Sequence, residues 1–389
     1  MTTSFARAIL VGCVALAIGR SVAAQAPSDS PFPTGQIVPD VVCAADSSHG
    51  YALYLPREYS TARAWPIIFA FDPGGRGRVP VERYQAAAEQ FGYVIVGSNN
   101  SRNGSQDLAK VVAVLTTDVM KRFRIDERRV YTAGMSGGAR VALIVALGSK
   151  AVAGVIASSA GYPDSKPRKT LPFPIFSTAG TEDFNRLEMR RLDEALTTPH
   201  RLVVFNGGHT WLSSELATEA VEWMELRAMQ DGIAPRESRL IDAMFARRAA
   251  AAEGAGSPKD LYLAARAMVD DFTGLKDVSK HAARAAELER NRDVRAALKA
   301  DRDEDNREEQ ILSEVYGAEQ RLTKDDDRTA ALMQLRHLWK DLSEKAKRQA
   351  DSVDRRIARR ALASLSASTR TTDADYLKII SEYRVSRGR

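Results

Sequence analysis

The sequence predicts an α/β fold with a doubly wound, mostly parallel sheet, followed by an all-α C-terminal region. Between residues 50 and 230, short apolar runs alternate with helical patterns, which is typical of βαβ units. After about Pro235 the strand patterns stop, and the apolar positions take the spacing of helices. We therefore expect a sheet-based domain at residues 41–232 and an all-helical region at 233–389.

Seven apolar runs predict the strands of the sheet. They are nearly continuous, which indicates strands that are covered on both faces, as in parallel sheets. The expected strands are 51–55, 66–71, 93–96, 129–133, 153–157, 173–177 and 201–205. The expected helices between and after them are 81–91, 106–123, 138–149, 188–196 and 216–231.

The C-terminal region carries helical patterns throughout. Apolar residues recur on one face over 261–272 and again over 278–288, and further helices are expected at 311–322, 332–342, 353–365 and 376–383. The GAGSP run at 254–258 predicts a turn between helices. The charged run at 301–309 is most simply explained by solvated helix faces, with a charged interaction surface as the alternative.

Composition excludes several classes of protein. The chain has 389 residues, of which 44% are hydrophobic and 27% charged, so it is neither disordered, collagen-like nor a multispan membrane protein. A net charge of +6 on so long a chain is weak evidence for nucleic acid, and we expect no such partner. Two cysteines form neither a disulfide framework nor a cysteine-rich zinc site, and Cys43 is expected to be a small buried side chain.

The first residues are typical of an export signal. Arg7 precedes an apolar run at 8–19, and small residues follow, so we expect a signal peptide at 1–24 and a linker at 25–40. The run is too short for a stable membrane span. Residues 10–13 also match a lipoprotein cleavage box at Cys13, but the apolar run continues past Cys13, which favours an ordinary signal. The expected location is the periplasm or the exterior.

The stretch GMSGG at 134–138 fits the G-x-S-x-G nucleophile elbow. It follows a predicted strand directly and opens a small-residue helix, which is the context that the motif requires. Glycines on either side allow the sharp turn that presents the hydroxyl of Ser136. Ser136 is the candidate nucleophile.

A serine needs a base within hydrogen-bond reach, and His209 is the histidine in a fitting place. It follows the strand at 201–205 through a short glycine loop, at the carboxyl edge of the sheet where catalytic groups gather. The alternative is a turn histidine bonded to backbone. The other histidines are expected to be structural or solvated: His49, His200, His281 and His337.

The base must be oriented by a carboxylate, and Asp183 follows the strand at 173–177. Its neighbour Glu182 is the alternative. The order Ser136, Asp183, His209 is the chain order of the α/β-hydrolase triad.

The oxyanion of an acyl-transfer intermediate needs two backbone N–H donors. Gly137, which follows the nucleophile, is one candidate. The loop after the strand at 66–71 offers Gly74, with Gly75 next, because Pro73 has no N–H; the alternative is a plain Pro-Gly turn. Trp211 and Arg76 lie beside these loops and could shape a substrate pocket, or else be a core residue and a solvated charge.

These motifs together resemble a known family. GMSGG at 134–138, GTED at 180–183 and GGHTW at 207–211 are similar to the bacterial polyhydroxybutyrate-depolymerase, feruloyl-esterase and phospholipase/carboxylesterase-like α/β hydrolases. The resemblance covers residues 41–230. It implies carboxylic ester hydrolysis through an acyl-enzyme, with neither a metal nor an organic cofactor. Where these enzymes usually carry His-Gly, this chain has Asp72-Pro73, which puts the oxyanion loop and the substrate class in question.

We therefore expect an exported serine esterase that acts on a small-molecule or polymer ester. Two alternatives stay open: a peptidase or amidase on the same triad, and a non-catalytic protein whose helical half binds a partner. The helical region could also serve self-association.

Overall fold

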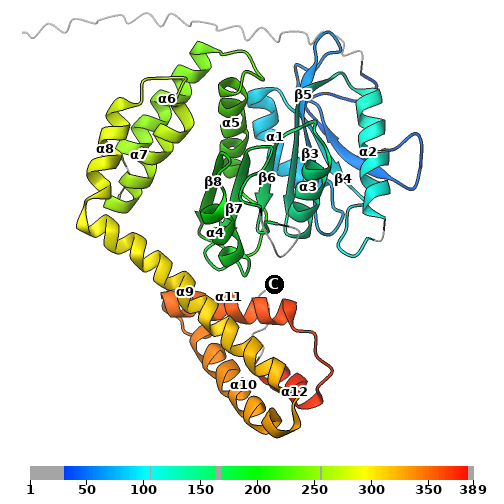
Figure 1. The fold of residues 1–389 in the computed structure, drawn as a ribbon. Coiled ribbons are helices and arrows are strands. Elements are labelled where there is room, and N and C mark those ends of the chain that lie inside the picture. Colours follow the sequence, from blue (N-terminus) through cyan, green and yellow to red (C-terminus); the bar gives the residue numbers. More distant parts are fainter. Residues whose placement is uncertain (1–29, 106, 163–167, 255, 384–389) are drawn as a thin grey trace, which may run out of the picture.

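The computed structural model describes residues 30–105, 107–162, 168–254 and 256–383 (Figure 1). The expected signal segment and the Cys13 lipoprotein box lie outside these ranges. The chain forms a sheet-based domain that is followed by a helical region, and the two are joined by contacts described below.

Within the described ranges, eight strands form the sheet, in the order β1-β2-β4-β3-β5-β6-β7-β8. Strands β1 and β2 and strands β2 and β4 pair antiparallel, and all other neighbours pair parallel. This arrangement is the α/β-hydrolase fold, and it confirms the predicted doubly wound, mostly parallel sheet. The strands are β1 (Ile37–Val42), β2 (Gly50–Tyr54), β3 (Trp65–Phe71), β4 (Val94–Ser98), β5 (Ile125–Met135), β6 (Val152–Ser158), β7 (Ile175–Gly180) and β8 (His200–Phe205).

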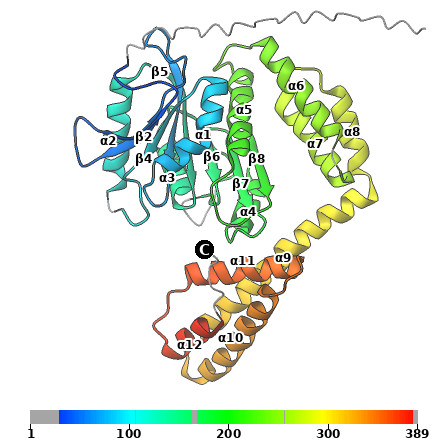
Figure 2. The same cartoon turned by 180° about the vertical axis from the view of Figure 1, so that it is seen from behind.

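Five helices cover the sheet: α1 (Arg78–Phe91), α2 (Leu108–Arg122), α3 (Gly137–Gly148), α4 (Arg186–Ala195) and α5 (Ser214–Gln230). Apolar residues of α1 and α5 pack on one face, and those of α2, α3 and α4 pack on the other (Figure 2). Strand β3 is buried along its whole length. Helices therefore shield both faces of the sheet from solvent, and its edges and strand ends are the parts that solvent can reach.

In the part of the chain that the structure describes, seven helices follow the sheet domain, as the predicted all-α region requires: α6 (Ser238–Glu253), α7 (Pro258–Phe272), α8 (Ser279–Glu289), α9 (Arg292–Arg321), α10 (Asp325–Ala346), α11 (Val353–Ser368) and α12 (Ala374–Tyr383). Helices α6 and α7 share a core with the end of α5. Helices α9 to α12 have a separate core around Trp339 and Leu365. The long helix α9 connects the two groups (Figures 1 and 2).

The acidic side chains of the charged run at 301–309 are not all solvated, contrary to the simplest sequence interpretation. Glu304, Asp305 and Glu308 are buried on the side of α9 that faces the sheet domain and α11. The alternative interpretation, a charged interaction surface, describes this side of α9, because its carboxylates bind arginines of other helices.

Within the described residues, no helix combines the length and the apolar character needed to cross a membrane. Cys43 is buried between β1 and β2, as expected. Burial, together with the nearby Asp118 carboxylate, raises the pKa of its thiol to about 11.

Candidate active site

Ser136 occupies a strained turn between β5 and α3. Its backbone has φ 55° and ψ −124°, a region that non-glycine residues seldom adopt. A Cβ on Gly134 would lie 2.1 Å from the carbonyl oxygen of Gly138, and a Cβ on Gly138 would lie 1.8 Å from that of Phe71. The two glycines thus let β3, β5 and α3 approach closely enough to form the elbow.

Ser136, His209 and Asp183 lie in one hydrogen-bonded chain. The Nε2 atom of His209 is 2.8 Å from the Oγ of Ser136, and its Nδ1 atom is 2.8 Å from Oδ1 of Asp183. Asp183 is fully buried, whereas the His209 side chain is 21% exposed. With the proton on Nδ1, His209 donates to the carboxylate and accepts the serine hydroxyl hydrogen. The structure therefore brings together the three side chains that the sequence pattern singled out, and Glu182 points elsewhere.

The loops that carry Asp183 and His209 are bonded to each other. We define the acid loop as residues 180–185 and the base loop as residues 206–211. The N–H of Thr181 donates to the carbonyl of Phe205, and the N–H of Glu182 donates to that of Gly207, each over 2.8 Å. A Cβ on Gly180 would lie 2.4 Å from the oxygen of Gly207, so the contact requires a glycine there. The distance between Asp183 and His209 depends on this pairing.

Two neighbours of Asp183 complete the surroundings, and sequence reasoning missed both. The ring of Phe184 stacks on the imidazole of His209. The N–H of Asn185 donates to Oδ1 of Asp183 over 2.9 Å, and its side chain donates to the carbonyl of Ser159 over 2.7 Å. Oδ2 of Asp183 has no hydrogen-bond partner among the described residues. The carboxylate is thus held through one oxygen only.

The expectation of a free N–H at Gly74 is not met. Gly74 donates to Oδ1 of Asp72 over 2.8 Å, and Gly75 donates to the carbonyl of Asp72 over 3.0 Å. The physical reason is the aspartate itself, because a side chain of this length bonds readily to the backbone two residues on. The backbone donors proposed for this loop are engaged within the loop.

Asp72 also binds the two residues considered for a substrate pocket. The indole N–H of Trp211 donates to Oδ2 of Asp72 over 2.8 Å, and Nε of Arg76 lies 2.9 Å from Oδ1. Burial acts to raise the pKa of Asp72, but the hydrogen bonds from Arg76, Trp211 and Gly74 outweigh it and hold the pKa below its usual value. Trp211 is buried in the core beside the sheet, whereas the Arg76 side chain is 65% exposed. Only Arg76 of the two is free to meet a ligand.

Asn103 lies against the turn at Ser136, and no sequence motif singled it out. The three heavy atoms nearest to a Cβ built on Gly137 all belong to the Asn103 side chain, the closest being Oδ1 at 1.8 Å. The N–H of Asn103 donates to the carbonyl of Pro73 over 2.8 Å, which ties its loop to the end of β3. An exposed amide therefore stands beside Gly137, the residue that follows Ser136.

The other four histidines have separate surroundings. His49 contacts Asp46, His200 contacts the carbonyl of Thr198, His281 packs edge-on against Phe245, and His337 is exposed. A cavity of about 950 Å³ lies between β8, α5, α6 and α7, and none of the residues that line it belongs to the acid loop, the base loop or the elbow. No group of three or more His, Cys, Asp or Glu side chains in the described ranges is arranged to hold a metal ion.

Neither a protein-family model nor a curated protein matches this sequence. Among solved structures, the chain is similar to a hyperthermophilic esterase from Pyrobaculum calidifontis, with 14% identity over 50% of this chain and 87% of that chain, at a TM-score of 0.40. It is also similar to a ferulic acid esterase, with 15% identity over 49% and 96% of the two chains and a TM-score of 0.41. A feruloyl esterase module from Clostridium thermocellum matches with 13% identity, over 51% and 90%, at a TM-score of 0.38. At identities of 13–15% and TM-scores of 0.38–0.41, this similarity does not establish an activity for the chain.

Proposed function

We propose that this protein is a serine hydrolase that cleaves carboxylic esters, with Ser136 as nucleophile, His209 as base and Asp183 as the orienting carboxylate. The observation that carries the proposal is the pair of 2.8 Å contacts of His209, one to the Ser136 hydroxyl and one to the buried Asp183 carboxylate. A nucleophile, a base and a group that orients the base are the parts that acyl transfer requires.

The proposed reaction begins when Oγ of Ser136 attacks the ester carbonyl while Nε2 of His209 takes its proton. The collapse of the tetrahedral intermediate expels the alcohol, which receives that proton from His209. Water then attacks the acyl-serine, His209 takes one of its protons, and the acid leaves as the proton returns to Ser136. Asp183 stays ionised throughout and stabilises the imidazolium that forms twice in the cycle.

The oxyanion donors that we propose are Gly137 and Asn103. The N–H of Gly137 is at the start of α3, where the first four N–H groups have no carbonyl of their own helix to bond. The Asn103 amide stands beside it, and a half-turn about its last side-chain bond exchanges the positions of Oδ1 and Nδ2. Asn103 takes the role that the sequence assigned to Gly74.

Labelling with a fluorophosphonate probe tests the nucleophile directly. We expect the unaltered protein to take up the label and the Ser136→Ala variant to take up none. Ser149 lies at the other end of α3, so Ser149→Ala is the matched control and is expected to label like the unaltered protein. If the unaltered protein took up no label, or if Ser136→Ala labelled equally well, the chain would not be a serine hydrolase.

The bond that is cleaved is tested with paired substrates. A p-nitrophenyl acyl ester and an amino-acid p-nitroanilide that share the same acyl group differ only in the leaving atom. We expect hydrolysis of the ester with a higher kcat/KM, and abolition by Ser136→Ala. Hydrolysis of the anilide alone would show an amidase instead.

A further inference from the structure

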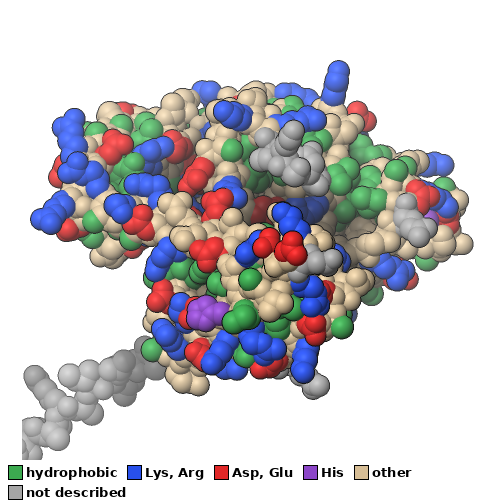
Figure 3. Space-filling view, turned by 60° about the horizontal axis from the view of Figure 1, so that its bottom comes forward, with side chains coloured by type: hydrophobic (Ala, Val, Ile, Leu, Met, Phe, Trp, Pro, Cys, Tyr) green, Lys and Arg blue, Asp and Glu red, His purple; other side chains and the backbone are tan. Residues whose placement is uncertain are grey.

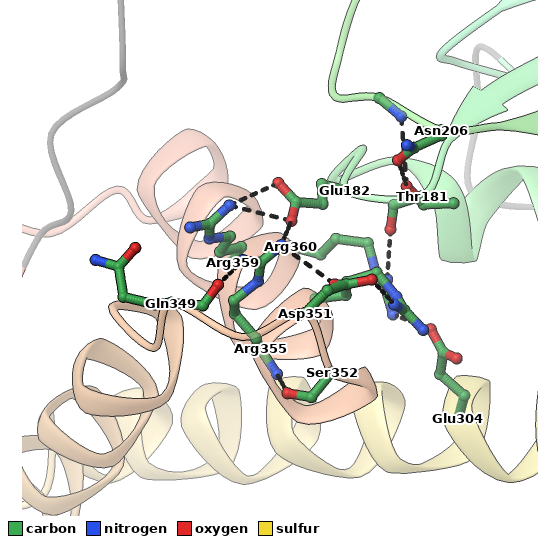
Figure 4. Close-up of polar contacts among 12 residues, drawn as sticks. Thr181, Glu182, Asn206, Glu304, Gln349, Asp351, Ser352, Arg355, Arg359 and Arg360 are labelled. Carbon is green, nitrogen blue, oxygen red and sulfur yellow. Dashed lines mark hydrogen bonds and ion pairs between the residues drawn. The ribbon is translucent and has the colours of Figure 1, made fainter.

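The helical region reaches the acid loop through arginines of α11. Nη1 of Arg360 donates to the carbonyl of Thr181 over 2.6 Å. Nη1 of Arg359 lies 3.1 and 3.0 Å from the two carboxylate oxygens of Glu182, and Nη2 of Arg355 lies 3.1 Å from Oε1 of the same group. Figure 4 shows these side chains converging on the loop from one face of the helix. The two residues before Asp183 are thus held from outside the sheet domain.

Arg360 is itself fixed by carboxylates of α9. It is fully buried, and it bonds Glu308 through Nε over 2.8 Å and Glu304 through Nη2 over 2.9 Å. A buried arginine with two charged acceptors has little freedom to reorient, since every alternative position leaves charges unpaired. The guanidinium that donates to the carbonyl of Thr181 is therefore held in a fixed position.

The other end of the acid loop is held by the same helix. Arg186, whose N–H donates to the carbonyl of Asp183 over 2.9 Å, bonds Asp305 of α9 over 2.7 Å. Arg190, one turn further along α4, lies 3.2 Å from the second oxygen of Asp305. Residues on both sides of Asp183 consequently contact the helical region. On the surface of this part of the molecule, acidic and basic side chains are likewise interspersed rather than separated by sign (Figure 3).

The carboxylate of Asp183 needs such support because its own contacts are few. Among the residues that the structure describes, only Oδ1 has partners, namely His209 and the N–H of Asn185, and both belong to the same pair of loops. A rotation of the acid loop would change the 2.8 Å contact to His209 without any further bond at the carboxylate to resist it. The arginines of α11 supply that resistance at the two preceding residues.

We propose that Arg355, Arg359 and Arg360 are positioning residues, which hold the Asp183 carboxylate against His209 by way of Thr181 and Glu182. The inference rests on the proposed function, since it concerns the efficiency of the same triad. It makes the helical region a part of the catalytic apparatus. A loosened acid loop slows the proton transfers of the cycle while leaving the groups that contact substrate in place, so it lowers kcat more than it alters KM.

The test uses the full chain with the double variant Arg355→Gln/Arg359→Gln, because both side chains are partly exposed and their replacement leaves the buried cluster intact. Arg356→Gln is the matched control, since this neighbour on α11 bonds Asp351 and none of the acid loop. Arg360→Met removes the contact to Thr181, and Glu182→Gln weakens the ion pair from the opposite side. Thermal unfolding verifies that each variant folds.

For the double variant we expect kcat to fall on the order of 10- to 100-fold, with KM within about twofold of the unaltered value. Glu182→Gln and Arg360→Met should also lower kcat. When Glu182→Gln is combined with the double variant, kcat should fall little further than in either variant alone, because both remove the same ion pairs. The proton NMR resonance of the hydrogen between His209 and Asp183 should shift or broaden in these variants, and stay unchanged in Arg356→Gln.

Two outcomes separate this inference from the proposed function. If the unaltered protein hydrolyses esters and Ser136→Ala does not, but the double variant matches Arg356→Gln in kcat and in the NMR resonance, the arginines are not positioning residues. If the unaltered protein hydrolyses nothing, the proposed function fails. In that case the NMR resonance still decides whether α11 holds Asp183 against His209.

Discussion

Phe184 stacks on His209, with ring centroids 4.0 Å apart and ring planes inclined by 29°. Phe184 thus fixes the plane of the His209 imidazole, while the neighbouring Asp183 fixes its tautomer. The imidazole is held at its edge by Asp183 and on its face by Phe184. A rotation of the imidazole that moved Nε2 away from the Oγ of Ser136 would break both contacts.

Phe184→Ala is therefore expected to lower kcat for a p-nitrophenyl ester by about fivefold, the equivalent of an aromatic contact of roughly 1 kcal/mol. Phe184→Tyr retains a ring of the same size and is expected to keep most of the activity. Steady-state kinetics of the two variants provide the measurement. An equal loss of kcat in the two variants would show that the aromatic ring of Phe184 does not support activity by stacking on His209.

Asp183→Asn should be far more damaging. An amide at this position favours the wrong tautomer of His209, and in a serine triad such a change costs kcat about 10⁴-fold. Glu182→Gln should retain much more activity, because Glu182 faces the arginines of α11 rather than the imidazole. Parallel kcat determinations decide which carboxylate orients the base. A greater loss for Glu182→Gln would reverse the assignment.

Asn103→Ala is expected to lower kcat on the order of 100-fold or more, since removal of one oxyanion donor has that effect in serine hydrolases. KM should change much less, because the donor acts on the charge that develops in the transition state. Asn100→Ala provides a control in the same loop, since its side chain bonds the carbonyl of Ser48 instead. A kcat for Asn103→Ala equal to that of the control would exclude the amide as a donor.

Two adjacent glycines of the elbow should respond differently to a methyl group. At Gly138 the new Cβ meets the backbone oxygen of Phe71 at 1.8 Å, so Gly138→Ala should cost about 3 kcal/mol of unfolding free energy or more. At Gly137 it meets the end of the exposed Asn103 side chain, which can move aside. Gly137→Ala should stay within about 1 kcal/mol of the unaltered protein. Urea unfolding of both variants tests the contrast, and equal stabilities would contradict it.

Asp72 should make stability depend on acid pH. Its pKa in the folded state lies below the usual value of about 3.9, so its contribution to stability is complete above that pH and is lost as pH falls through the folded pKa. Asp72→Asn keeps a side-chain oxygen but does not titrate. We expect the variant to be less stable than the unaltered protein at pH 6, and the difference to narrow towards pH 3. Urea unfolding at the two pH values provides the measurement, and a constant difference would argue against this role.

The sheet was predictable from the sequence because its strands are buried on both faces and appear as continuous apolar runs. Strand β1 was not predicted, and it begins at Ile37, within the range expected to be a linker. In this strand Ile37 and Val38 are only half-buried, and Pro39 and Asp40 are exposed. The strand therefore shows no continuous apolar run. In the first half of α9 the sequence predicted a helix face at 301–309 but not its burial, because the buried side chains there are the carboxylates Glu304 and Asp305 rather than an apolar run.

The grouping of Ser136, Asp183 and His209 could be predicted because each follows a parallel strand, and the carboxyl ends of such strands share one edge of the sheet. The hydrogen bond from the N–H of Gly74 to Asp72 could not be predicted, because it depends on the orientation of one side chain within its own loop. The bond from Arg360 to Thr181 joins residues 179 positions apart and follows no periodicity. Contacts of that kind become visible only in three dimensions.

The distance along the chain between the acid loop and α11 has a consequence for the order of events during synthesis. Glu182 precedes Arg355 by 173 positions, so at ribosomal rates the acid loop emerges roughly 9 to 35 s before the helix that holds it. The sheet can form in that interval, with Ser136, Asp183 and His209 already made. A nascent chain that has passed residue 209 but has not yet reached residue 355 thus contains Ser136, Asp183 and His209 without the arginines of α11, and their contacts to the acid loop form only after α11 has been made.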